Sequence, residues 1–138
     1  MSEEELTELA YANLLDTLSY LASIKAQEKY IIGGTEEEYI VPEDLLEDFL
    51  IEVDFFKFEK FPNRINWLKS KASEKGFMFI EDLYTNIEDS GLFFEKYTHA
   101  NIAGLVNDDP VWLKLRDKSA HILNLCDFDL EAWEKKNA

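Results

Sequence analysis

The sequence predicts an all-α fold, a compact single-domain bundle of five to seven helices that spans residues 1–138. Apolar residues recur at three- and four-residue steps through much of the chain, which is the period of a helix with one buried face. The chain has three prolines and five glycines, and no segment shows the sustained alternation of a β-strand. With 138 residues, 46% of them hydrophobic, the chain can bury a core without disulfides or metal ions.

The first expected helix follows Ser2 and extends to about residue 29. Ser2 and Glu5 have the spacing of a capping box, which marks the start of a helix. The apolar stripe predicted to face inward is Leu6, Leu9, Ala10, Leu14, Leu18 and Leu21. The glycine pair at 33–34 breaks the pattern, and residues 35–41 are expected to form a loop.

A second helix is expected to begin at Pro42. Proline suits the first turn of a helix, where its missing N–H costs nothing, and Glu43 and Asp44 favour the positive end of the helix dipole. The residues predicted to face inward are Leu45, Leu46, Phe49, Leu50 and Val53. Pro62 indicates that the chain has left this helix before that point.

The third expected helix covers about residues 63–75, and Gly76 is its predicted C-terminal stop. Its predicted inner residues are Ile65, Leu68 and Ala72. A shorter fourth helix is expected over residues 77–87. The residues predicted to face inward there are Phe79, Ile80, Leu83 and Ile87.

The remaining helices follow from local start and stop signals. A serine-glycine pair at 90–91 is expected to break the chain before a fifth helix over residues 92–106. The aspartate-proline pair at 109–110 predicts the start of a sixth helix. Its predicted apolar residues are Trp112, Leu115, Ala120, Ile122 and Leu123. Asp129 is expected to cap a last short helix that carries Trp133.

The charge of the chain restricts its partners. Net charge is −15 at pH 7, and the sequence pI is near 4.4. The first sixty residues hold sixteen acids and four bases, whereas the rest hold thirteen acids and ten bases. Such a chain is poorly suited to bind DNA, RNA or anionic lipid directly, because it repels phosphate. The uneven distribution favours an interaction face that binds a basic protein.

The most acidic segment, residues 36–59, holds ten carboxylates and one lysine. On the second helix, Ile51 and Phe55 are expected to lie among carboxylates on the outward side, as apolar anchors within a polar rim. The predicted partner-binding residues are Glu36, Glu37, Glu38, Tyr39, Glu43, Asp44, Glu47, Asp48, Ile51, Glu52, Asp54 and Phe55. The simplest alternative is an ordinary helix face surrounded by water.

The leading functional hypothesis is a non-enzymatic inhibitor or immunity-type protein that neutralises a basic toxin or nucleic-acid enzyme. Carboxylates spaced along a helix can imitate a phosphate backbone to a basic groove. A second hypothesis is a structural or adaptor subunit of a transcription or assembly complex, in which apolar residues within 55–61 pack against another chain. Salt separates the two, because a steered acidic inhibitor loses association rate as ionic strength rises.

A third hypothesis is a helical-bundle metalloprotein. Glu95 precedes His99 by four residues and Asp117 precedes His121 by four, so each pair shares a helix face. The spacing departs from the Glu-x-x-His pattern of di-iron bundles, and a chain with 29 acids produces such pairs by chance.

No catalytic or cofactor motif is present, so we expect neither an enzyme nor a bound cofactor. Cys126 is the only cysteine, which excludes an intramolecular disulfide and is expected to be a buried, inert thiol. No signal peptide and no run long enough for a membrane span is evident, and the chain is expected to be cytoplasmic.

Overall fold

The computed structural model describes residues 1–90 and 94–138, and it confirms the all-α prediction. Seven α-helices and no strand occur in these two ranges. The helices are α1 (Glu3–Ala22), α2 (Ile24–Gln27), α3 (Pro42–Lys57), α4 (Asn63–Glu88), α5 (Ile102–Asp108), α6 (Pro110–Leu125) and α7 (Leu130–Asn137). A π-helical turn, Glu28–Ile32, follows α2, and a 3₁₀ turn, Phe94–Lys96, precedes α5. No helix of the described ranges is both long and apolar enough to cross a bilayer.

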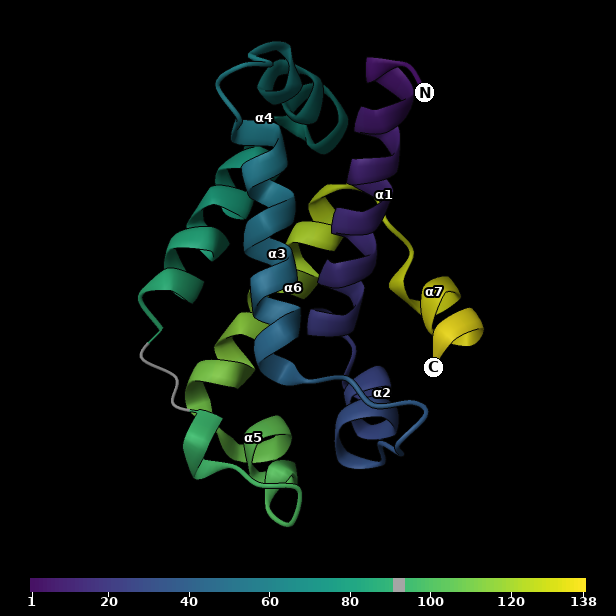
Figure 1. The fold of residues 1–138 in the computed structure, drawn as a ribbon, viewed down its shortest axis with the longest axis vertical. Coiled ribbons are helices and arrows are strands. Elements are labelled where there is room, and N and C mark those ends of the chain that lie inside the picture. Colours follow the sequence, from purple (N-terminus) through teal and green to yellow (C-terminus); the bar gives the residue numbers. More distant parts are fainter. Residues whose placement is uncertain (91–93) are drawn as a thin grey trace.

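Helices α1 and α3 lie side by side and run in opposite directions, with α6 behind them (Figure 1). Helix α4 packs against α3 and α6, while α5 packs against α6. One continuous core lies between these helices, and its largest fully buried side chains come from α1, α3, α4, α5, α6 and the π-helical turn. Trp112 is the bulkiest of them, and its indole N–H donates to the buried Gln27 side chain over 3.0 Å.

The first helix begins where the sequence predicts, but it ends at Ala22, earlier than the predicted end near residue 29. The Ser2–Glu5 capping box is present, with Glu5 N–H donating to Ser2 Oγ over 3.1 Å. The helix ends at Ala22 because Ser23 leaves the helical region and caps α2, accepting from Ala26 N–H over 3.0 Å. The predicted loop over residues 35–41 contains no helix or strand.

Part of the predicted inner stripe of that first helix is wrong. Leu14, Leu18 and Leu21 are buried, but Leu6 is 36% exposed and Leu9 is 48% exposed. Both leucines lie in the first two turns of α1, beside the last turns of α3. A periodic stripe therefore continues beyond the edge of the core.

Helix α3 agrees with the prediction. It begins at Pro42 and buries Leu45, Leu46, Phe49 and Val53, while Leu50 is half-buried. The helix ends at Lys57, and Phe58 adopts an extended conformation before the turn that leads into α4.

Gly76 is not the stop that the sequence predicts. The break in α4 lies at Ser73, whose φ of 70° and ψ of 161° are outside the helical region. The Ser73 hydroxyl accepts from Gly76 N–H over 3.0 Å and so caps the second half of α4. Gly76 is buried instead: a Cβ there would lie 3.3 Å from Ser73 Oγ and 3.4 Å from Ala72 Cβ. The glycine is thus explained by close packing.

The predicted fifth helix, over residues 92–106, is correct only at its end, where α5 begins at Ile102; residues 91–93 lie outside the described ranges. After Phe94–Lys96 the chain is not helical until Ile102. The Asn101 side chain accepts from Thr98 N–H and donates to the Lys96 carbonyl, and these local bonds replace a helical ladder. The sixth and seventh helices are confirmed, since Asp109 caps α6 and Asp129 caps α7.

Candidate functional site: the groove between helices α1 and α3

Eight of the nine predicted carboxylates are exposed on helix α3 and the loop before it, and one of them, Asp54, accepts a hydrogen bond from α4. The other seven are Glu36, Glu37, Glu38, Glu43, Asp44, Glu47 and Asp48. None of the seven forms a salt bridge within residues 1–90 and 94–138, where the four ion pairs lie at other positions. This surface therefore carries negative charge that no base of the described chain neutralises.

The two predicted anchors differ in accessibility. Ile51 is 65% exposed on the outward side of α3. Phe55 is half-buried, because its ring lies 3.8 Å from the Arg64 guanidinium carbon and packs edge-on against Phe56. Ile51 is thus available for contact, whereas Phe55 already has contacts within the chain.

Two other predicted acids turn to opposite sides of α3, so the twelve predicted residues do not form one face. Asp54 accepts from the Tyr84 hydroxyl of α4 over 2.8 Å, and this hydrogen bond raises the pKa of Tyr84 to about 12. Glu52 turns towards α1 instead, where its Oε2 accepts from the Thr17 hydroxyl over 3.0 Å. The acidic surface is divided between an α4 side and an α1 side.

Glu52 is the most perturbed carboxyl group at this site. Its Oε1 atom is buried and has no hydrogen-bond partner within the chain. Burial raises the pKa of Glu52 to about 7, and the nearby Asp48 and Asp16 carboxylates act in the same direction. A group in this state would gain from any hydrogen-bond donor or cation that reached Oε1.

Two hollows of different chemistry lie along α1 and α3, and we refer to them together as the α1–α3 groove. We call the first the apolar half, a hollow of about 220 Å³ with Asn13 and Glu52 at its edge. The apolar side chains that line it are Leu6, Leu9, Ala10, Ile51 and Phe55.

The second or acidic half is a hollow of about 360 Å³ further along the same two helices. Three exposed carboxylates line it, those of Asp16, Asp44 and Asp48. The rings of Tyr20 and Tyr39 lie beside them.

Tyr39 holds its place at the end of the acidic half because Gly34 leaves room for its ring. A Cβ on Gly34 would lie 2.2 Å from Tyr39 Cδ2 and 2.7 Å from the Tyr30 carbonyl oxygen. The Tyr39 ring also lies edge-to-face with His99, with ring centroids 6.2 Å apart. Tyr39 remains 41% exposed.

Sequence reasoning missed the contribution of α1 to this groove. The sequence pattern places Leu6 and Leu9 in the core. It gives no role to Asp16 or Tyr20, although both line the acidic half. A signal does exist, because Leu6, Leu9, Asn13, Asp16 and Tyr20 follow one another at three- and four-residue steps and so share one face of α1.

The two histidines pack against different aromatic rings, His99 against Tyr39 and His121 against Phe79. Within the ranges that the structure describes, no group of three or more His, Cys, Asp or Glu side chains could hold a metal ion. Cys126 is half-buried, not fully buried as expected, and burial raises the pKa of its thiol.

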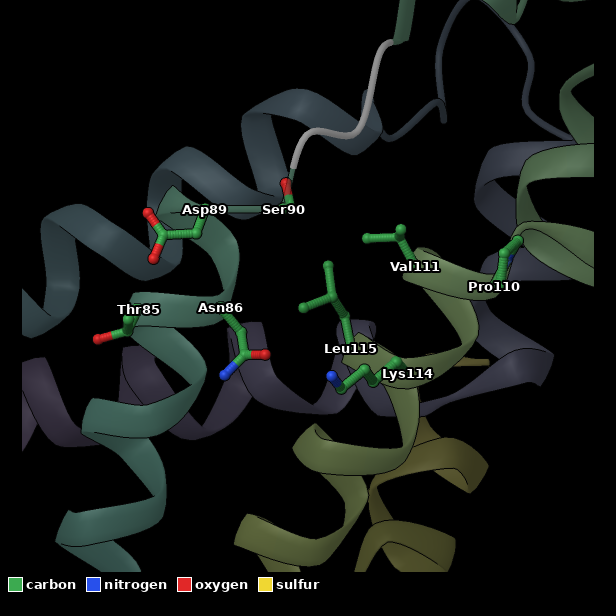
Figure 2. A pocket seen from close by; sticks show the side chains of 8 residues that line it. All are labelled: Thr85, Asn86, Asp89, Ser90, Pro110, Val111, Lys114 and Leu115. Atoms are coloured by element: carbon green, nitrogen blue, oxygen red, sulfur yellow. The ribbon is translucent and has the colours of Figure 1, made fainter.

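A further hollow of about 430 Å³ lies between the end of α4 and the start of α6 (Figure 2). Val111 and Leu115 of α6 point into it, and Asn86 of α4 faces them. Its described lining holds one ammonium group, Lys114, and one carboxylate, Asp89, without histidine or cysteine. These residue types suggest no reaction.

Comparison of the chain with protein-family models, with curated proteins and with solved structures gave no match.

Proposed function

We propose that this chain is a non-enzymatic binding domain for a basic protein, most simply an inhibitor or immunity-type protein that neutralises a basic toxin or nucleic-acid enzyme. One observation carries the proposal: seven exposed carboxylates on α3 and the loop before it have no base to pair with in the described ranges, and Ile51 is exposed on the same helix. Like charges at this density destabilise the compact state. A partner with Lys and Arg side chains removes that repulsion when it binds.

The physical chemistry of the surface suits rapid capture of a cation-rich partner. A net charge of −15 steers a positively charged protein towards the chain at low ionic strength. Glu43 and Glu47 lie one helical turn apart, about 6 Å along the axis. A basic groove that holds a phosphate backbone depends mainly on such regularly spaced charge. The lone Cys126 fits a reducing compartment, and we propose that the protein acts in the cytoplasm.

The experiment compares capture by the wild-type chain with capture by the double variant Glu47→Lys/Asp48→Lys. Its control is Glu28→Lys/Asp117→Lys, which changes the net charge equally at exposed positions away from α3. We expect the wild type and the control to retain a basic protein from source lysate and the α3 variant to lose it. The association rate of the purified partner should fall at least tenfold between 0.05 and 0.5 M NaCl, about the range over which the Debye length shrinks severalfold.

Equal capture by both double variants, or an association rate that salt does not change, would overturn this proposal.

A second candidate function, an adaptor subunit, is favoured by two exposed rings in the turn between α3 and α4. Phe58 is 49% exposed and Phe61 is 42% exposed, although Phe56 of the same segment belongs to the core. A permanent contact through these rings would resist salt and would be lost in Phe58→Ser/Phe61→Ser. The salt series therefore separates the two functions.

A further inference from the structure

We propose that the α1–α3 groove receives a single helix of the basic partner, with apolar residues at one end of that helix and lysine or arginine at the other. The apolar end would lie over Leu9 and Ile51, and the cationic end over Asp16, Asp44 and Asp48. This inference rests on the proposed function, and it specifies the binding position and the chemistry of the partner.

The apolar half of the groove leaves large side chains in contact with water. Leu6, Leu9 and Ile51 come from two adjacent helices and are exposed, and the half-buried Phe55 lines the same hollow. Interfaces of high affinity place apolar anchors of this kind near their centre. An amphipathic helix that adds its apolar side to such a groove is a common form of recognition.

The acidic half carries the negative charge that would pair with the cationic end of such a helix. Asp16, Asp44 and Asp48 are exposed around one hollow, and none of them forms a salt bridge within the described ranges. Asp16 is already oriented, because its Oδ1 accepts from the Trp133 indole N–H over 2.8 Å. The Tyr39 ring beside these carboxylates offers a face for a cation.

Glu52 marks the boundary between the two halves. It lines the apolar half, yet its bonded partner, Thr17, lines the acidic half. Its Oε1 lacks a hydrogen-bond partner. The first cationic residue of the bound helix would lie over this boundary and attract the Glu52 carboxylate, so a partner with its charge and apolar residues separated along the helix fits better than one with them mixed.

The length of the groove sets the length of the partner helix. From Leu6 to Tyr20, α1 rises about 21 Å at 1.5 Å per residue. A helix of about fourteen residues, four turns, would cover both halves. Helices α1 and α3 run side by side in opposite directions (Figure 1), and the two hollows follow one another along them.

The test uses two synthetic helical peptides of identical composition and charge, titrated into the full chain at 0.15 M NaCl by fluorescence anisotropy. The segregated peptide carries leucines in its first half and lysines in its second, whereas the mixed peptide distributes both evenly. We expect the segregated peptide to bind at least tenfold more tightly. A photo-reactive group at its leucine end should cross-link to residues around Leu9, and one at its lysine end to residues around Asp44.

Variants locate the binding and separate this inference from the proposed function. Leu9→Ser/Ile51→Ser should weaken the segregated peptide at least tenfold, while Met78→Ser, at an equally exposed apolar position on α4, should change nothing. Circular dichroism confirms that each variant folds.

Equal affinity for both peptides, equal effects of the two variants, or cross-linking of the leucine end to residues around Asp44 would overturn the inference. Suppose that Glu47→Lys/Asp48→Lys abolishes capture of the basic partner while Leu9→Ser/Ile51→Ser leaves it intact. The groove is then the wrong position, and the proposed function stands. If the wild-type chain captures no basic protein at all, the proposed function fails as well.

Discussion

Replacing Glu52 by glutamine should stabilise the protein relative to the wild type more at pH 8 than at pH 5. The folded pKa of Glu52 is about 7, above its ordinary value of 4.5. Folding therefore favours the protonated form. The stability that Glu52 contributes is fully present below pH 4.5 and is lost as the pH rises through about 7. Glutamine resembles the protonated form at every pH.

The size of the effect follows from the same pKa. A rise from 4.5 to about 7 corresponds to about 3 kcal/mol at 1.36 kcal/mol per unit. Glu52 is only half-buried, so water screens part of this cost, and we expect roughly 1–2 kcal/mol. Two other carboxyls act in the opposite direction: their hydrogen bonds and charges lower the pKa of Glu3 and of Asp109, against the effect of burial. Glu3 and Asp109 contribute equally to the free energy of unfolding of the variant and of the wild type, so their effect cancels in the difference between the two.

The assay is urea unfolding of wild type and Glu52→Gln at pH 5, 6, 7 and 8, analysed by linear extrapolation. The free energy of unfolding of the variant should rise relative to wild type by roughly 1–2 kcal/mol between pH 5 and pH 8. Glu47→Gln, an exposed acid on the same helix, is the control and should show a smaller change. A difference for Glu52→Gln that stays constant with pH, or that falls as pH rises, would refute the reasoning.

Three further substitutions test the local structure, each by the free energy of unfolding in urea. Ser73→Gly should stabilise the protein by about 1 kcal/mol, since relief of the backbone strain at φ 70° exceeds the loss of a cap, whereas Ser73→Ala should destabilise it by about as much. Gly34→Ala should destabilise the protein by about 1–3 kcal/mol, because the new Cβ would overlap the Tyr39 ring; an unchanged midpoint would contradict the packing described. Arg64→Ala should lower the free energy of unfolding by about 2–3 kcal/mol, and Arg64→Lys should lower it nearly as much. The reason is that only a guanidinium can contact Glu3, the Phe55 carbonyl and two aromatic rings together. Wild-type stability in the lysine variant would argue against that role.

The parts of the fold that the sequence predicted correctly depend on local chemistry. The caps at Ser2, Asp109 and Asp129 each satisfy backbone N–H groups within three residues, so neighbouring residue types are enough to recognise them. The break at Ser73 is different. A serine at positive φ is unfavourable on its own, and it persists because the helix halves on either side are fixed by the core. The sequence predicts the stop at Gly76 because glycine adopts positive φ more readily than serine does.

The composition of the candidate site could be predicted, but its shape could not. Charge is a property of residue types, so the acidic segment was evident. Whether Leu6 and Leu9 are covered by the core depends on where α3 ends beside them. The spacing of apolar residues in α1 carries no information about that position. The division of Glu52 and Asp54 between two sides of α3 likewise depends on the positions of Thr17 and Tyr84.

Glu52 connects the stability of this protein to its proposed function. An unpartnered carboxyl oxygen beside Asp16 and Asp48 lowers the stability of the free chain near neutral pH. A cation bound at the groove would favour the charged form and lower the pKa of Glu52, so binding would release a proton at pH 6–7. The partner would then bind more tightly at pH 8 than at pH 6, and Glu52→Gln would remove that dependence while raising the stability of the unbound chain.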